Sequence, residues 1–179
     1  PIYKVSAFLK KYILKGVITM HIIYHCYGGT HTSVIASYIH IGVLPADKVP
    51  TKEEIEGIPM FDKLNGKNDT GHIVSIGTDE YGNNVYSLGV KNGKKLVEPA
   101  LKDLYYHLFN TNDGLLIIDT SSATNWIMKI GGFTSIALKI SIIGRPLVTY
   151  GVIKAYKNIV QIVKNVKAQE SAEYNAIKR

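Results

Sequence analysis

The order of apolar runs along the chain is the feature that most constrains its fold. Short runs rich in aliphatic and β-branched residues, such as residues 21–26 and 114–119, are separated by longer segments whose apolar residues recur every three or four positions. Parallel strands need a crossover between them, and that crossover is usually a helix. The alternation therefore predicts an α/β protein, a three-layer sandwich with a mostly parallel sheet.

Residues 73–90 predict one antiparallel pair within that sheet. Two β-rich runs flank the polar sequence DEYGNN, which contains the residue types that form turns between hairpin strands. We therefore expect one β-hairpin to be added to the parallel strands.

The remaining periodic segments predict helices. The expected helices cover residues 33–41, 51–57, 96–109 and 123–140, and a long amphipathic segment begins at residue 152. Within the helix over 96–109, the side chains expected to face inward are Leu101, Leu104, Tyr105 and Leu108.

Glycine and proline are interpreted as interruptions of the later helices. Gly131 and Gly132 predict a break within 123–140, and the sequence Gly144, Arg145, Pro146 predicts a turn.

Length and composition favour a single domain. With 46% hydrophobic and 20% charged residues, the 179-residue chain has a globular composition and enough length for one core. We expect one α/β domain over residues 20–170, an extension over 1–19 and a flexible tail over 171–179. The extension has the apolar spacing of a surface helix, but the ordered pattern begins at Met20. It is interpreted either as a helix or as a segment that is not native.

The formal net charge of +7 is concentrated at the two ends of the chain. Residues 1–19 hold four lysines and no acidic residue, and residues 152–179 hold six basic against two acidic residues; the stretch between them has 11 against 12. Basic ends are usually solvated helix faces, and the interleaved aromatic pattern of nucleic-acid sites is missing. Nucleic-acid binding is therefore disfavoured, and the basic terminal helices are interpreted as a surface for a protein partner.

The sequence carries no signal for membrane insertion or export. No stretch reaches the roughly 18 consecutive apolar residues of a membrane-spanning helix. A single cysteine cannot form an internal disulfide, and lysines interrupt the N-terminal apolar residues without a cleavage pattern. We therefore expect no membrane span and a cytoplasmic location.

The sequence HCYGGTHTS, residues 25–33, lies between the first predicted strand and the first predicted helix. The first turn of a helix leaves amide N–H groups free and carries a partial positive charge, so it attracts anions. Adjacent glycines let the backbone approach such a ligand, and hydroxyl side chains can add donors. The residues expected to bind a phosphorylated or other anionic small ligand are Gly28, Gly29, Thr30, Thr32 and Ser33, joined from a later loop by Arg145.

The same loop places the single cysteine in this positive field. A helix N-terminus stabilises thiolate over thiol, so Cys26 is a candidate nucleophile for phosphoryl transfer. His31 and Asp119 are the candidate general acids or bases. A free cysteine can also fill apolar space, and the loop would then belong to a non-catalytic binding module for a phosphorylated metabolite or nucleotide. The sequence leaves both interpretations open.

Metal and cofactor sites are not predicted. His25, Cys26 and His31 lack a recognised ligand spacing and a fourth ligand. No cofactor motif is identified.

Known phosphate loops differ in how well they fit residues 26–33. The P-loop pattern G-x-x-x-x-G-K-[ST] is missing, and in the cysteine-phosphatase pattern C-x5-R-[ST] Thr32 stands in place of the arginine. The pattern C-x-x-G-x-x-T-S fits, and it is similar to the loop of cysteine-phosphorylated B subunits of the sugar phosphotransferase system. In those proteins the cysteine accepts a phosphoryl group from a histidine of a partner and passes it to a sugar. The likeness covers eight residues and implies a turn that holds phosphate.

From Met20 onward the chain resembles a bacterial family of uncharacterised proteins, domain of unknown function 3189. The resemblance rests on the pieces IIYHCYGGTHTSVIASYIHIGVLP, TDEYGNNVYSLG, IGGF and GRPLV, which follow one another in this order. The family has no established activity, so the resemblance bears on the fold and the domain boundary. It leaves residues 1–19 outside the family pattern.

Overall fold

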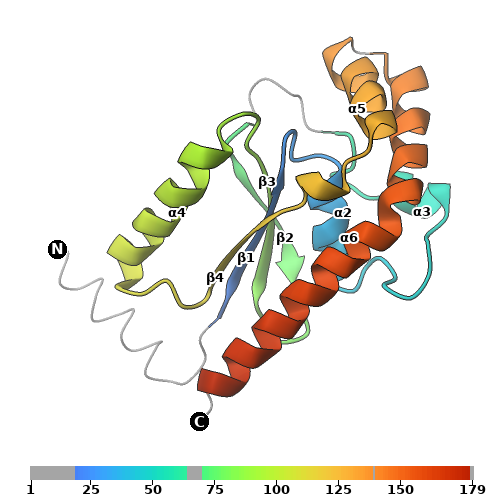
Figure 1. Ribbon diagram of the computed structural model, residues 1–179. Coiled ribbons are helices and arrows are strands. Elements are labelled where there is room, and N and C mark those ends of the chain that lie inside the picture. Colours follow the sequence, from blue (N-terminus) through green and yellow to red (C-terminus); the bar gives the residue numbers. More distant parts are fainter. Residues whose placement is uncertain (1–18, 64–69, 139, 178–179) are drawn as a thin grey trace.

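The computed structural model describes residues 19–63, 70–138 and 140–177 (Figure 1). Residues 1–18 of the predicted extension lie outside the described residues. The predicted tail is described as far as Ile177, where the last helix ends.

A four-stranded sheet forms the centre of the molecule. Its strands are β1 (His21–Cys26), β2 (Ile73–Thr78), β3 (Asn84–Gly89) and β4 (Leu115–Asp119). They are ordered β2-β3-β1-β4, with β1 parallel to both β3 and β4 and β2 antiparallel to β3. The predicted α/β class, with a mostly parallel sheet and one hairpin, is confirmed.

Helices cover both faces of the sheet, and Figure 1 shows α4 on one side and α2 and α6 on the other. The helical segments are α2 (Thr32–His40), α3 (Lys52–Glu56), α4 (Lys94–Phe109), a 3₁₀ turn (Ser121–Ala123), α5 (Trp126–Gly132), a π-helical turn (Phe133–Ala137) and α6 (Ser141–Ile177). In the described part of the chain, none of these helices is long and apolar enough to cross a membrane.

The alternation of side chains along β1 divides the core into two unequal parts. Ile22 and Tyr24 join the large cluster shared with α2 and α6, whereas Ile23 joins a small cluster on the α4 side. The main core therefore lies between the sheet and the pair α2 and α6.

The helix α4 differs from the sequence prediction in how deeply its apolar face is covered. Leu104 and Leu108, which were expected to face inward, are 56% and 55% exposed. They line an apolar groove of about 260 Å³ together with residues of the sheet, among them Tyr86 and Leu115. The apolar periodicity identified the face of α4 that lies towards the sheet, but the described residues leave this face partly exposed.

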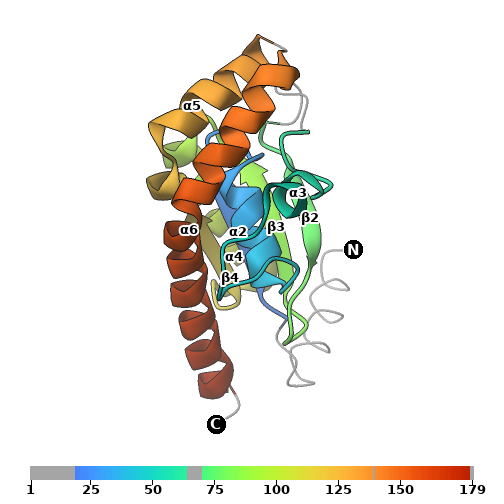
Figure 2. The ribbon, with the colours of Figure 1, turned by 90° about the vertical axis from the view of Figure 1, so that its right-hand side faces the viewer.

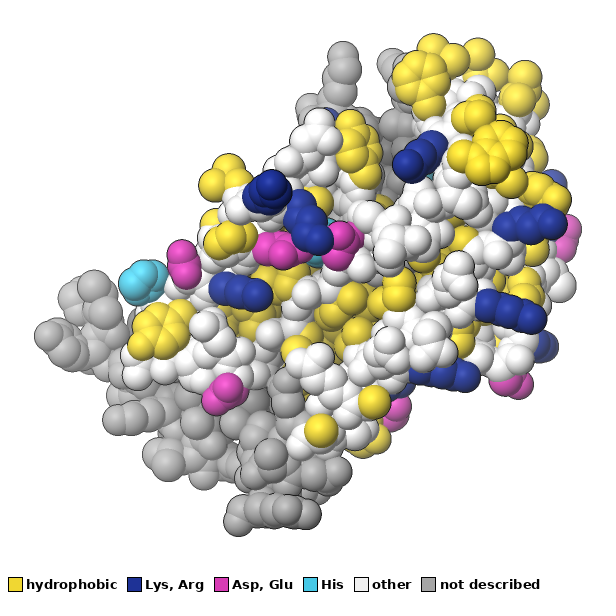
Figure 3. All heavy atoms as spheres, in the orientation of Figure 1, with side chains coloured by type: hydrophobic (Ala, Val, Ile, Leu, Met, Phe, Trp, Pro, Cys, Tyr) yellow, Lys and Arg dark blue, Asp and Glu magenta, His cyan; other side chains and the backbone are white. Residues whose placement is uncertain are grey.

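The predicted turn at Gly144–Pro146 is wrong, because α6 runs through it from Ser141. Gly144 is needed instead for a close approach, since a Cβ atom there would collide with the backbone of Ser135. Figure 2 shows α5 alongside the first part of α6, while the rest of α6 crosses the sheet. Exposed apolar side chains gather over the α5 end of the molecule (Figure 3); they include Trp126, Ile130, Phe133, Ile142 and Ile143.

Candidate functional site

The carboxyl ends of the three parallel strands bring distant parts of the chain to one edge of the sheet. Cys26 at the end of β1 is in register with Gly89 of β3, and His25 is in register with Asp119 of β4. Ligands of open α/β sheets bind beyond this edge. The loop over residues 27–31, which joins β1 to α2, lies here.

Gly29 folds this loop tightly onto the end of β3. Its φ of +71° is in the left-handed region, and a Cβ atom at this position would be 2.5 Å from the backbone nitrogen of Gly89. The hydroxyl of Ser87, one strand away, donates to the carbonyl of Gly29 at 3.2 Å. The loop is therefore held by backbone contact, which requires glycine at position 29.

The sulfur of Cys26 is buried among polar groups. The residue is 5% exposed, and Sγ accepts a hydrogen bond from the Gly29 amide at 3.2 Å. The Ser33 hydroxyl lies 3.2 Å from Sγ, and the Ser87 hydroxyl lies 2.9 Å from that of Ser33. The sulfur is therefore in contact with polar groups of the loop and of α2, although it is shielded from solvent.

The start of α2 leaves amide groups without acceptors. The first intrahelical bond runs from the Ile35 amide to the His31 carbonyl at 2.9 Å, and the His31 side chain does not cap the helix. The amides of Thr32, Ser33 and Val34 therefore have no acceptor among the described residues, although all three residues are buried. The first turn also contains no acidic residue that would neutralise its partial positive charge.

The three hydroxyl residues of the loop have different surroundings. Thr30 Oγ1 is buried and has no hydrogen-bond partner among the described residues. Thr32 Oγ1 accepts from the Thr120 hydroxyl at 3.0 Å, which fixes it to the segment after β4. The Ser33 hydroxyl forms hydrogen bonds with the Ser87 hydroxyl and the Cys26 sulfur. Thr30 thus offers the unused hydroxyl.

His31 is held by a carboxylate on the other side of the loop. Its Nε2 lies 3.0 Å from Oδ1 of Asp62, and the Ser135 hydroxyl donates to Oδ2 of Asp62 at 2.5 Å. Burial pulls the pKa of Asp62 upward, but the hydrogen bonds from His31 and Ser135 outweigh burial and leave the pKa below its ordinary value. Asp62 is therefore the ionised partner that orients the His31 ring.

Arg145 makes no hydrogen bond to the loop. Its Nη2 donates to the Glu56 carbonyl at 3.1 Å and the Phe61 carbonyl at 3.5 Å. Its charge also contributes to the lowered pKa of Asp62. The structure thus places Arg145 beside the segment that carries Asp62.

Asp119 lies on the opposite face of the sheet from Cys26. Its Oδ2 accepts from Lys94 Nζ of α4 at 2.6 Å, and its Oδ1 accepts from the Ser121 amide at 2.8 Å. Burial raises its pKa, but these two hydrogen bonds outweigh burial and leave the pKa below its ordinary value. The ionised, lysine-paired Asp119 is not placed to exchange a proton at the sulfur.

Sequence reasoning missed a second polar group, which lies on the α4 face. His25 is 1% exposed, and its Nε2 lies 2.7 Å from Oε1 of Glu98, while its Nδ1 is 4.0 Å from Oδ1 of Asp119. Ser87 was also missed, because nothing local marks a hydroxyl that will meet a loop more than 50 residues away. Asp119, by contrast, was identified from the sequence, because an acidic residue that closes an apolar run often lies at a strand end.

Comparison with known proteins identifies a family but no characterised relative. Residues 21–168 match the family model described as Protein of unknown function (DUF3189). No curated protein and no solved structure matches the chain.

Proposed function

The chain belongs to the DUF3189 family, whose description states no activity, and from the site itself we propose that it binds a phosphate-type oxyanion on the loop between β1 and α2. The observation that carries this proposal is the set of buried donors without acceptors: the amides of Thr32, Ser33 and Val34 and the hydroxyl of Thr30. Buried donors are nearly always paired, so four unpaired donors at the junction of this loop and the first turn of α2 call for an acceptor from outside the chain.

The chemistry of these donors favours an anion with several oxygens. All four donate, and they lie at the positive end of α2, where a phosphate group accepts several hydrogen bonds at once. Gly28 and Tyr27 are exposed, so the loop has a solvent-facing side through which a ligand can enter. The exposed Lys91 lies beside the loop, because its backbone amide donates to the Tyr27 carbonyl at 2.8 Å.

A second candidate function, phosphoryl transfer through Cys26, is favoured by the two groups around its sulfur. The Gly29 amide donates to Sγ, and the Ser33 hydroxyl lies 3.2 Å from Sγ, within reach to donate to a thiolate. In this step the thiolate attacks phosphorus of a phosphoryl donor, an S–P bond forms, and the P–O or P–N bond to the leaving group breaks. The leaving atom takes a proton, for which His31 is the candidate donor. The loop's likeness to cysteine-phosphorylated B subunits supports the same chemistry.

Anion binding is tested by titrating the folded chain with inorganic phosphate in a calorimeter and comparing two glycine variants. Gly29 and Gly42 both have positive φ, but only Gly29 contacts another backbone, since a Cβ at Gly42 meets nothing within 4 Å. We expect Gly29→Ala to weaken phosphate binding at least about tenfold, because the loop must leave Gly89, and Gly42→Ala to bind as the wild type does. Equal binding by wild type and a folded Gly29→Ala variant would refute the proposal.

The transfer step is tested separately with Cys26→Ser, which keeps a small polar side chain at this site. The wild type is expected to react with iodoacetamide near neutral pH, to be protected by phosphate, and to form a Cys26-linked phosphoryl group with a small phosphoryl donor, detected by mass spectrometry. If Cys26→Ser binds phosphate normally and the wild type never becomes phosphorylated, the protein is a binding module and the transfer step is wrong.

A further inference from the structure

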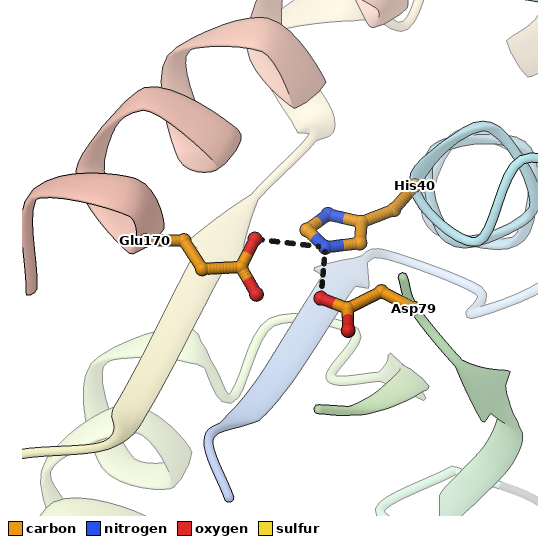
Figure 4. A group of neighbouring side chains, drawn as sticks. All are labelled: His40, Asp79 and Glu170. Carbon is orange, nitrogen blue, oxygen red and sulfur yellow. Dashed lines mark hydrogen bonds and ion pairs between the residues drawn. The ribbon is translucent and has the colours of Figure 1, made fainter. Parts of the chain in front are cut away.

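Three buried side chains meet at the edge of the sheet opposite the loop. His40 is the last residue of α2, Asp79 follows β2, and Glu170 lies on α6 (Figure 4). All three side chains are 0% exposed. Their elements are far apart in the sequence, so only the tertiary fold brings these groups together.

The spacing of their atoms suits a shared cation. Nε2 of His40 lies 3.4 Å from Oδ2 of Asp79 and 3.3 Å from Oε2 of Glu170, and all three atoms lie within 4.8 Å of one another. Ligand atoms about 2.0–2.1 Å from a tetrahedral metal are separated by about 3.3–3.4 Å. Charge-assisted N–H···O bonds are shorter, about 2.7–2.9 Å. The observed separations are therefore long for ion pairs and appropriate for ligands.

Neighbouring groups also hold the three ligands, and Oδ2 of Asp79 itself accepts from Asn83 Nδ2 at 3.2 Å. Tyr24 Oη lies 2.8 Å from Nδ1 of His40, which turns Nε2 towards the carboxylates. Oδ1 of Asp79 accepts from the amides of Tyr81 and Asn83, each at 2.8 Å, and the Asn83 side chain donates to Oε1 of Glu170. Such outer partners typically orient metal ligands.

One carboxylate oxygen is left without a donor. Oε2 of Glu170 is buried and has no hydrogen-bond partner among the described residues. It is the same atom that faces Nε2 of His40. An unpaired buried oxygen aimed into the cluster is an independent indication of a missing ligand.

The cluster also places two carboxyl groups close together: burial and the neighbouring Asp79 raise the pKa of Glu170, whereas hydrogen bonds to Asp79 outweigh burial and lower the pKa of Asp79 to about 2. Two carboxylates face one imidazole, and in the described part of the chain neither carboxylate forms an ion pair with lysine or arginine. Buried charge without compensation is costly. A divalent cation would balance both carboxylates and fill the space between the three atoms.

We propose that His40, Asp79 and Glu170 supply three of the ligands of a divalent cation of the Zn²⁺ class, a set that a water molecule completes to four. Imidazole and carboxylate donors at this spacing suit Zn²⁺ better than Mg²⁺, which prefers an octahedral set of oxygens and retains several waters. The ion connects the end of α2, the turn between β2 and β3, and α6. This site is separate from the anion loop, and neither proposal depends on the other.

The test uses the untagged full chain, stripped with a chelator and dialysed against Zn²⁺. We expect about one bound equivalent by mass spectrometry of the metal and a higher Tm with Zn²⁺ than without it. Substitution with Co²⁺ should give the visible absorption of a tetrahedral site. Mg²⁺ should raise the Tm far less than Zn²⁺ at the same concentration.

Two glutamate variants separate this site from adventitious binding. Glu170→Gln keeps the shape of a ligand but removes its charge, and it should bind Zn²⁺ at least about tenfold more weakly. The matched control is Glu80→Gln, because Glu80 pairs with Lys167 at 2.6 Å and so connects the same turn to the same helix outside the cluster. Glu80→Gln should keep the bound equivalent, the Tm rise and the Co²⁺ absorption.

The proposal is overturned if the stripped wild type takes up no stoichiometric Zn²⁺, or if Zn²⁺ raises the Tm of Glu170→Gln as much as that of the wild type. In the first case a proton on the carboxylate pair balances the charge. If Glu170→Gln does not fold, the metal content and the Co²⁺ absorption of the wild type test the proposal. Asp79→Asn is then the second variant, and it should also bind Zn²⁺ more weakly than the wild type.

Discussion

Asp62 determines how His31 is presented, and its ionisation should be visible in the stability of the protein. Its pKa is lowered in the folded state, so ionised Asp62 stabilises the fold above its ordinary pKa of 3.8, and this contribution is lost as the pH falls through the lower folded value. The free energy of unfolding of the Asp62→Asn variant should therefore be about 1–3 kcal/mol lower than that of the wild type at neutral pH. Its stability should also fall less steeply than that of the wild type between about pH 5 and about pH 3.

Urea unfolding followed by circular dichroism at several pH values measures this difference. Asp47→Asn is the control. Asp47 is also an aspartate, but it is exposed and forms no ion pair with His31. Parallel pH profiles for Asp62→Asn and the wild type would show that the His31–Asp62 pair contributes nothing to the acid sensitivity.

At this scale the sequence predicts the loop but not its surroundings. Two glycines between an apolar run and a periodic segment are enough to place a tight turn before a helix, and Gly29 has the positive φ that such turns use. The partner Ser87 comes from β3 and Thr120 follows β4, and no local pattern marks the hydrogen bonds that they form. The face on which Asp119 lies was also hidden, because a run that is apolar at every position has no alternation to indicate a side.

Among the elements, α5 and α6 depend on glycine where they cross. A Cβ atom at Gly131 would be 2.6 Å from the backbone nitrogen of Val148, so Gly131→Ala must push the helices apart. We expect this variant to lose about 1–3 kcal/mol of unfolding free energy, as for other overpacked sites. Lys129→Ala, on the exposed side of the same helix, should change it by less than about 0.5 kcal/mol. Thermal or urea unfolding of both variants makes the comparison.

These glycines also explain why the helices were only partly predicted. A glycine within a periodic segment indicates either a break or a close approach, and the choice depends on a partner that the local sequence does not contain. Gly131 and Gly144 both serve close approach. The helix α6 continues through Gly144, where the sequence suggested a turn, whereas α5 does end at Gly132, as the predicted break implied, and a π-helical turn follows it. The strands were easier to predict, since an apolar run followed by turn residues needs no knowledge of a partner.

At the scale of the whole molecule, two polar sites occupy opposite ends of α2. Thr32 at its start belongs to the proposed anion site, and His40 at its end belongs to the proposed cation site. The two sites share no contact, so their effects on stability should add. In metal-free, phosphate-free buffer, the unfolding free energy of the double variant Gly29→Ala with Glu170→Gln should differ from that of the wild type by the sum of the two single changes, within about 0.5 kcal/mol. A deviation above about 1 kcal/mol in urea unfolding would show that α2 couples its two ends.

The global architecture was the most predictable level. Alternation of strands and helices fixes the α/β class, and parallel strands necessarily bring their carboxyl ends to one edge. The cation site could not be foreseen, because its three residues come from a helix end, a turn and a distant helix, and none has a ligand neighbour at a recognisable spacing.

The pleat of β1 has a consequence for insertions and deletions in this family. His25 and Cys26 are neighbours in the chain, yet one points towards Glu98 on α4 and the other towards Ser33 on α2. Adding or removing one residue within β1 would exchange thiol and imidazole between the two faces while leaving composition almost unchanged. Homologues that retain the chemistry of this edge should therefore keep the length of β1 constant and accommodate length changes in the loops.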